Sequence, residues 1–226
     1  LGTGWTETEF RMSGIPFPPI SERLRMLDEA LTCIKSLWAN EQSNFAGEFY
    51  HLKNATLWPK PIQKPRPPII VGGGGKGLLR IAAKHADFIN IVPDSGKRGH
   101  ISIVEVKKLT DAGYQEKVRF LREEAKRAGR DPNALRVSNF IFALALTESP
   151  AMSRQIAEGM APMFQISADE VLASPMVLIG TPDECIKELT RREQKWGVAQ
   201  FLISDGAGAI DEKIMRRLRE EVIAHL

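Results

Sequence analysis

The feature that most limits how this chain can fold is a short apolar run followed at once by four glycines. Ile69, Ile70 and Val71 come directly after a proline-rich stretch, and Gly72–Gly75 come directly after them. A wholly apolar run that is bounded by proline and glycine predicts a strand buried on both faces. Such strands are typical of parallel sheets covered by helices, so this segment predicts an α/β fold.

The rest of the chain repeats an alternation of short strands and amphipathic helices. Apolar residues at steps of three and four predict a helix over 21–39, and the segment 45–57 predicts a short hairpin. Further strands are predicted at 87–92, 136–146 and 201–203. Further helices are predicted at 78–83, at 110–128, after Ser149-Pro150, from Thr181 to Trp196 and over 211–225. This order predicts a parallel sheet with outer helices, either half of a barrel or a small open sheet.

The glycine run also predicts a phosphate-binding loop. Glycines permit a tight turn and let an anion approach the backbone N–H groups, while the following helix directs its free amides to the same place. Lys76 could add a full positive charge. A tight turn without a ligand is the alternative, because glycine turns are common. The run matches neither a Walker A loop nor a dinucleotide-binding fingerprint.

Composition and charge exclude several classes of function. The net charge is +3 and the basic residues are interleaved with Glu and Asp, which argues against a nucleic-acid partner. No apolar run reaches about 18 residues, so no membrane span is expected. Cys33 and Cys185 lie far apart on predicted helices, which is typical of reduced thiols in a cytoplasmic protein. The four histidines lack the spacing of metal ligands, so no metal site is predicted.

A few further residues are candidates for a site. His85 lies on a predicted helix, where a hydrogen-bonded or solvated ring is expected. Lys97, Arg98 and His100 follow the second complete strand and could face a substrate, although a solvated loop is the alternative. Ser204-Asp205-Gly206 predicts a turn. The methionines have roughly helical spacing and indicate core packing or, alternatively, a cover for a cofactor; they are Met152, Met160, Met163 and Met176.

Several segments together resemble one known family. Five segments of the chain are similar to segments of luciferase-like oxidoreductases that use coenzyme F420. They are Gly2–Trp5, Arg23–Trp38, Phe45–Pro61, Pro67–Gly73 with the Ala82-Ala83 and Ala86-Asp87 pairs that follow it, and Ile179–Glu184. The segments occur in the order of that family and span nearly the whole chain. The resemblance is therefore more specific than any one motif.

The resemblance implies a (β/α)₈ TIM barrel of the bacterial luciferase-like type that lacks its N-terminal part, with strands four or five to eight present. It implies one domain over residues 1–226, with an insertion around 147–175. The cofactor would lie at the carboxyl ends of the strands. Thr3, Gly4 and Trp5 would line the deazaflavin ring, and Gly72, Gly73, Gly74, Gly75 and Lys76 would hold its phosphate.

The activity implied is hydride transfer between coenzyme F420 and a small organic substrate. In the family, the residue often proposed as acid or base lies in the first three strands, so no catalytic residue is named. The alternatives are an FMN-dependent luciferase-like monooxygenase, whose phosphate would use the same loop, and a non-catalytic flavin-fold protein or degenerate fragment that binds a partner. Open barrel edges predict a homodimer. The 226 residues alone are expected to be unstable or inactive.

Overall fold

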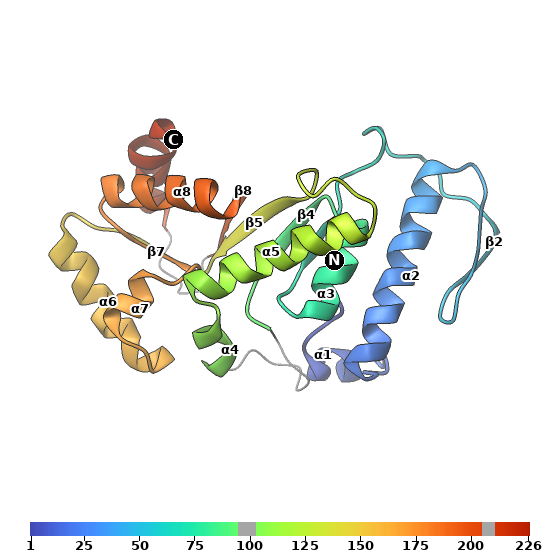
Figure 1. Cartoon of the computed structure of the whole chain (residues 1–226), viewed down its shortest axis with the longest axis horizontal. Helices are drawn as coiled ribbons and strands as arrows, with labels where there is room; N and C mark the ends of the chain where they lie inside the picture. Colours follow the sequence, from blue (N-terminus) through green and yellow to red (C-terminus); the bar gives the residue numbers. More distant parts are fainter. Residues whose placement is uncertain (95–102, 205–210) are drawn as a thin grey trace. The chain divides into compact units, whose positions relative to one another are not determined.

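The structure is a computed structural model that describes residues 1–94, 103–204 and 211–226 (Figure 1). Contacts within the chain divide it into two compact units. The first unit contains Leu1–Ile89 and Leu121–Leu135, and the second contains Asn90–Asp94, residues 103–120 and Arg136–Leu226. The predicted loop candidates Lys97, Arg98 and His100 lie outside the described residues, as do Asp205 and Gly206.

The first unit holds the strand that ends in the glycine run. Its elements are α1 (Glu7–Met12), α2 (Ile20–Ala39), β1 (Ser43–Ala46), β2 (His51–Ala55), β3 (Ile70–Gly72), α3 (Lys76–His85), the first half of β4 (Phe88–Ile91) and the second half of α5 (Asp111–Arg127). β3 and β4 are neighbours in one sheet, and α2 packs against α3. Val71 and Ile89 are completely buried, as expected for strands covered on both faces.

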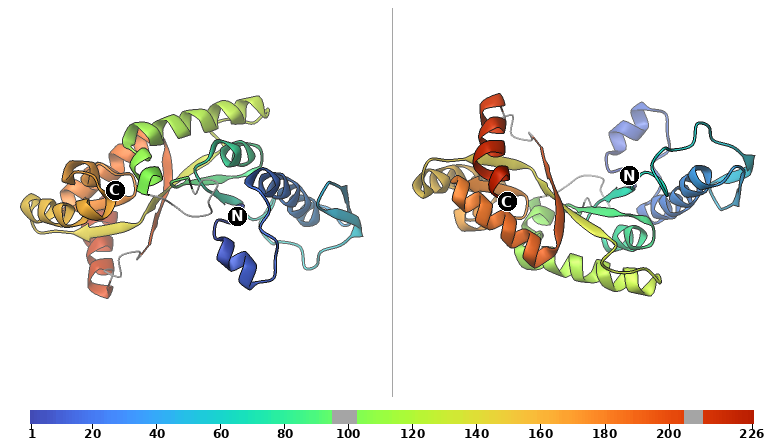
Figure 2. Two further views of the ribbon diagram at one scale, coloured as in Figure 1. Left: turned by 90° about the horizontal axis from the view of Figure 1, so that it is seen from below. Right: turned by 90° about the horizontal axis from the view of Figure 1, so that it is seen from above.

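α2 is the long helix of this unit and confirms the predicted helix over 21–39. Its apolar stripe buries Leu27 and Leu31, as an amphipathic helix should. β1 and β2 form the predicted antiparallel hairpin, which projects from the region of α2 in both views of Figure 2. The Glu29 carboxylate accepts hydrogen bonds from the backbone amides of residues 48–50, so it fastens the hairpin turn to the helix.

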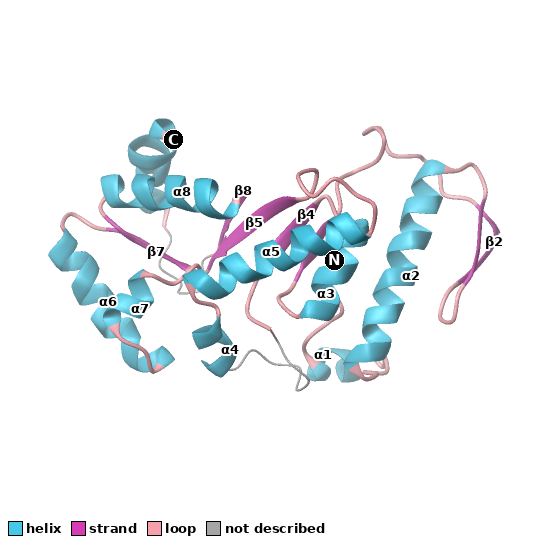
Figure 3. Cartoon of the chain, in the orientation of Figure 1, coloured by secondary structure: helices cyan, strands magenta, loops and turns pink. Residues whose placement is uncertain are grey.

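The second unit contains the remaining elements (Figure 3). They are the second half of β4, α4 (Ile103–Lys108), the first half of α5, β5 (Arg136–Ile141), β6 (Ala143–Leu146), α6 (Pro150–Phe164), α7 (Ala168–Leu172), β7 (Val177–Gly180), α8 (Pro182–Trp196), β8 (Val198–Ile203), α9 (Glu212–Arg217) and the terminal turns Leu218–Val222 and Ile223–His225. β5 pairs with β8 and β6 pairs with β7, and both pairs are parallel. These parallel pairs agree with the predicted α/β fold.

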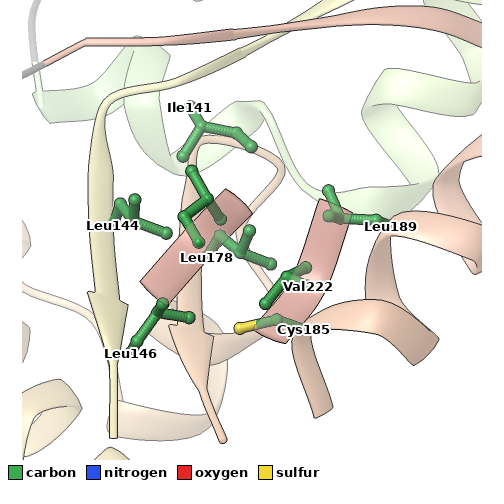
Figure 4. Packing of buried hydrophobic residues seen from close by; sticks show 8 residues of the cluster. Ile141, Leu144, Leu146, Leu178, Cys185, Leu189 and Val222 are labelled. Carbon is green, nitrogen blue, oxygen red and sulfur yellow. The ribbon is translucent and has the colours of Figure 1, made fainter. Parts of the chain in front are cut away.

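A compact apolar cluster holds this unit together (Figure 4). Leu144 and Leu146 of β6, Leu178 of β7, and Cys185 and Leu189 of α8 all pack into it. Both cysteines of the chain are free and buried, as predicted. The end of the chain covers the cluster with Leu218 and Val222.

Two helix starts in this unit follow the rules that predicted them. The Ser149 side chain accepts a hydrogen bond from the amide of Met152 at the start of α6. At the start of α8, Thr181 and Glu184 form a reciprocal capping box, with the Thr181 amide 2.8 Å from the Glu184 carboxylate. α8 ends at Gly197, which adopts the left-handed conformation at φ 68°.

Several local predictions were wrong or incomplete. Neither β7 nor α4 was predicted. The final helix is α-helical only over Glu212–Arg217, after which the backbone widens into a π-helical turn and ends in a 3₁₀ turn. Of the four methionines expected either in the core or over a cofactor, Met160 lies against an apolar cluster, whereas Met152 and Met163 are exposed. α6 and α7 occupy most of residues 147–175, where an insertion stays a prediction.

Candidate cofactor site

The predicted phosphate loop connects the carboxyl end of β3 to the first turn of α3. Gly75 is the N-cap residue of α3, and no side chain caps the helix start. Gly73 adopts a φ of 153°, and the Leu78 side chain fills the space where a Cβ atom would lie. Only glycine therefore suits position 73, because any side chain would be strained by the backbone and would meet Leu78.

The amides of the glycine run do not all serve the same purpose. The Gly72 amide donates a 2.9 Å hydrogen bond to the carbonyl of Leu1, so it is already used. Gly74 and Lys76 also have interaction partners. By contrast, the hydrogen bonds found among residues 1–94, 103–204 and 211–226 include none from the amides of Gly73 or Gly75. These two donors, beside an uncapped helix start, fit the requirements of a phosphate group.

The opening turn of the chain lies directly beside this loop. The Leu1 nitrogen donates to the Ile70 carbonyl at 2.7 Å, and the Leu1 carbonyl accepts from the Gly72 amide. This is the hydrogen-bond pattern of two parallel strands. A Cβ atom on Gly2 would lie 3.3 Å from the Gly72 carbonyl oxygen. The structure therefore brings together the two segments that were predicted separately, Thr3–Trp5 and the glycine run.

The turn has a fixed shape and an open side. Gly4 adopts a φ of 75°, and the Phe10 ring occupies the place of its missing side chain. Trp5 is 51% exposed, and Thr3 is half-buried. An aromatic side chain held at the surface beside the carboxyl end of a strand is suited to contact a planar ring.

Arg23 binds the backbone carbonyls of this turn, and it was not among the residues predicted to form the site. Its Nη1 atom donates to the Gly4 carbonyl at 2.5 Å and to the Thr3 carbonyl at 3.4 Å, and its Nε atom donates to the Pro18 carbonyl at 3.0 Å. The guanidinium also lies 3.8 Å from the centre of the Phe17 ring. A signal was present in the sequence, because Arg23 interrupts the apolar face of the helix four residues before Leu27.

A second charged cluster lies at the opposite end of α3. His85 is buried, and its Nε2 atom lies 2.7 Å from Asp28 Oδ1, so the prediction of a hydrogen-bonded ring is confirmed. Lys35 Nζ lies 3.3 Å from His85 Nδ1, and Lys84 also binds Asp28. Burial lowers the pKa of His85 despite the hydrogen bond to Asp28.

Lys35 is the most perturbed amine of this cluster. Burial and then the nearby charges of Arg66 and Arg130 lower its pKa to about 8. Arg66 itself binds Asp87, whose carboxylate also accepts the amide of Ile69 at 2.6 Å. These contacts fix the start of β3 and the end of α3. The cluster therefore stabilises the elements that carry the glycine run but does not lie at the glycine run itself.

An apolar groove of about 470 Å³ is present in the first unit but does not coincide with the glycine run. Its lining includes Ile34 and Trp38 of α2 together with Pro68 and Ile69. It therefore lies toward the amino end of β3, whereas ligands of parallel α/β folds bind at the carboxyl ends of strands. The position of this groove therefore does not identify the candidate site.

Comparison with known proteins identifies the family. The family model described as luciferase-like monooxygenase matches residues 1–200. The chain belongs to this family. Its fold is accordingly of the luciferase-like barrel type that the resemblance implied, and the family consists of oxidoreductases and monooxygenases.

Individual members of the luciferase-like family share limited identity with the chain. An F420-dependent glucose-6-phosphate dehydrogenase of Microbacterium testaceum is 27% identical over all of this chain and 67% of the relative. An FMNH₂-dependent dimethylsulfone monooxygenase of Pseudomonas putida is 35% identical, but over only 38% of this chain and 24% of the relative. The chain spans 58% of the F420-dependent glucose-6-phosphate dehydrogenase of Intrasporangium calvum.

Solved structures support the fold assignment. The coenzyme F420-dependent tetrahydromethanopterin reductase of Methanopyrus kandleri superposes with a TM-score of 0.70 at 17% identity, over 99% of this chain and 72% of that one. At this identity the likeness shows the fold alone. Within the part of the chain that the structure describes, no helix is long and apolar enough to cross a membrane.

Proposed function

We propose that this luciferase-like chain forms the cofactor-holding part of an F420-dependent oxidoreductase. The observation that carries the proposal is the meeting of two segments at the carboxyl end of β3: the opening turn Thr3–Trp5 and the uncapped start of α3 after the glycine run. In this proposal the amides of Gly73 and Gly75 bind the cofactor phosphate. Lys76, at the first position of α3, adds positive charge beside it.

The other residues of the site position the ring. Gly4 allows the backbone to turn, Thr3 and Trp5 lie along the ring, and Gly72 and Gly74 keep the backbone close enough for the phosphate to approach. When bound, coenzyme F420 supplies hydride transfer to or from a small organic substrate. The chain supplies binding and orientation, and we assign no catalytic acid or base among its residues.

The deazaflavin is favoured over FMN by the extent of the similarity. The F420-dependent relative of Microbacterium testaceum aligns with the whole chain, whereas the FMNH₂-dependent relative aligns with 38% of it. That shorter match has the higher identity, 35%, and it keeps an FMN-dependent monooxygenase as the second candidate. A non-catalytic flavin-fold protein is the third, and it predicts binding without hydride transfer.

Binding and turnover measurements separate these candidates. The purified protein is titrated with coenzyme F420 and with FMN, and cofactor fluorescence gives the two dissociation constants. We expect tighter binding of F420 than of FMN. Loss of the oxidised deazaflavin absorbance after an alcohol or sugar is added would separate an active oxidoreductase from a non-catalytic flavin-fold protein. Tighter binding of FMN would support the monooxygenase, and absence of binding to either cofactor would refute the proposal.

The Gly73→Ala variant tests the loop itself. Its new methyl group meets Leu78 and its backbone is strained at a φ of 153°, so the loop must move. We expect F420 affinity to fall at least about tenfold, equivalent to about 1.4 kcal/mol. Gly129→Ala is the matched control, because Gly129 also has a positive φ of 72° but has open space around it and lies beyond the end of α5. Equal affinity in the two variants would contradict the assignment of the loop.

The domain organisation, oligomeric state and location of the protein are part of the same proposal. We propose that residues 1–226 are part of one luciferase-like barrel domain, with the segment 147–175 as an insertion, in a cytoplasmic homodimer. Exposed apolar side chains such as Trp58 and Ile62 support self-association. Light scattering coupled to size-exclusion chromatography measures the mass directly, and a monomer at micromolar concentration would exclude the dimer.

A further inference from the structure

Arg23 is a buried cation whose partners are backbone carbonyls. Its side chain belongs to a residue that is only 4% exposed, and it donates to the carbonyls of Pro18, Thr3 and Gly4. Among the residues that the structure describes, no carboxylate forms an ion pair with it. Burial lowers the pKa of Arg23, but a guanidinium remains charged at neutral pH.

Carbonyl oxygens accept hydrogen bonds from the Nε and Nη1 atoms of Arg23 without neutralising its charge. A buried charge is costly unless it is paired, and the Phe17 ring 3.8 Å from the guanidinium carbon offsets part of that cost. The positive charge therefore remains next to the turn that carries Thr3 and Trp5. An anionic ligand whose ring lies along this turn would be attracted by this charge.

The neighbouring residue of the same helical turn contacts the other half of the site. A Cβ atom on Gly77 would come within 2.6 Å of Leu24 Cδ1, so Leu24 lies tightly against the start of α3. Gly77 is the second residue of α3, immediately after Lys76. Two consecutive residues of α2 thus contact the opening turn on one side and the helix that follows the glycine run on the other.

We propose that Arg23 is a positioning residue for the anionic redox cofactor. It holds the Thr3–Trp5 turn in the shape that receives the ring, and its uncompensated charge raises the affinity for the anion. This inference rests on the proposed function, because it needs an anionic cofactor whose ring lies along the turn. Arg23 would act on cofactor binding although it contacts the site only through backbone carbonyls.

The test compares variants at Arg23 with variants at Arg25, using the whole protein. Arg23→Lys keeps the charge but cannot make the same fork of hydrogen bonds, and Arg23→Met removes both. Arg25→Lys and Arg25→Met are the matched controls, because Arg25 lies on the same helix but is exposed and bound to Glu48. Dissociation constants for coenzyme F420 are measured by fluorescence at several salt concentrations, and hydrogen–deuterium exchange is followed in the peptide that covers residues 1–6.

We expect Arg23→Lys to weaken F420 binding about tenfold and Arg23→Met about a hundredfold, with a weaker salt dependence in Arg23→Met only. Exchange in the opening peptide should rise in both variants and stay unchanged in the Arg25 controls. If Arg23→Met does not fold, Arg23→Lys decides. F420 affinity equal to wild type in a folded Arg23→Lys variant would overturn the inference while leaving the proposed function intact. A wild-type protein that binds no F420 or FMN would instead refute the proposed function itself.

Discussion

The cluster around Lys35 makes a quantitative prediction about stability and pH. Lys35 has a pKa of about 8 in the folded chain, against an ordinary value of 10.5. Because the folded-state pKa is the lower one, the unfolded chain binds more protons between these values, and the stability must rise with pH. The charges that face Lys35 are Arg66, Arg130 and Lys84, which lower its pKa, and Asp87, which raises it.

The size of the effect follows from the two pKa values. The difference of 10.5 − 8 = 2.5 units corresponds to about 3.4 kcal/mol at most. Between pH 7.5 and pH 10 the linkage relation gives a gain of about 2.4 kcal/mol for wild type relative to a chain without this amine. Lys35 keeps some solvent contact, which screens its interactions, so we expect about 1 kcal/mol.

The assay is urea unfolding of wild type and Lys35→Met at the two pH values. Subtracting the two proteins removes the contribution of every other group that titrates in this range. The free energy of unfolding of wild type should increase by about 1 kcal/mol relative to Lys35→Met when the pH rises from 7.5 to 10. Lys53→Met removes an exposed lysine of the hairpin and controls for net charge. A constant difference between wild type and Lys35→Met would show that Lys35 is not desolvated as described.

Two further predictions concern stability in the second unit. Thr181→Ala removes the capping box with Glu184 and should lower the free energy of unfolding by about 1 kcal/mol, measured by urea unfolding; no change would mean that the cap does not form in solution. Arg192→Met should lower the free energy of unfolding by about 3 kcal/mol, because Arg192 is fully buried and its loss leaves Asn139 Oδ1 and the Val177 carbonyl without their donor. The exposed Arg219→Met control should cost less than about 1 kcal/mol, and equal thermal unfolding of these two arginine variants would contradict the buried role of Arg192.

Local signals in the sequence were sufficient for the elements that depend on local physics. The stripe of α2 and the capping box of α8 involve residues three or four apart, and both are present in the structure. The strand before the glycine run was predicted because its apolar residues are bounded by proline and glycine. The glycine run was predicted as a phosphate loop from its own residues, whereas the Thr3–Trp5 half of the candidate site was predicted only from family resemblance.

The features that were missed depend on contacts between distant residues. β7 has only four residues, too few to show a period, and it exists as a strand because Leu178 and its neighbours pair with β6, more than thirty residues earlier. Arg23 is charged, and it can be buried because its guanidinium donates hydrogen bonds to carbonyls of residues up to twenty positions away in the chain. The Gly72 amide is consumed by Leu1, 71 residues before it, which no local rule anticipates.

The pairing of Leu1 with β3 has a mechanical consequence. The backbone of the opening turn and the backbone of the glycine run are joined through hydrogen bonds on both sides of Val71. A displacement at the end of this strand would therefore move the opening turn and the glycine run together. In the proposed mode of binding, the distance between the residues along the ring and those at the phosphate would then stay constant.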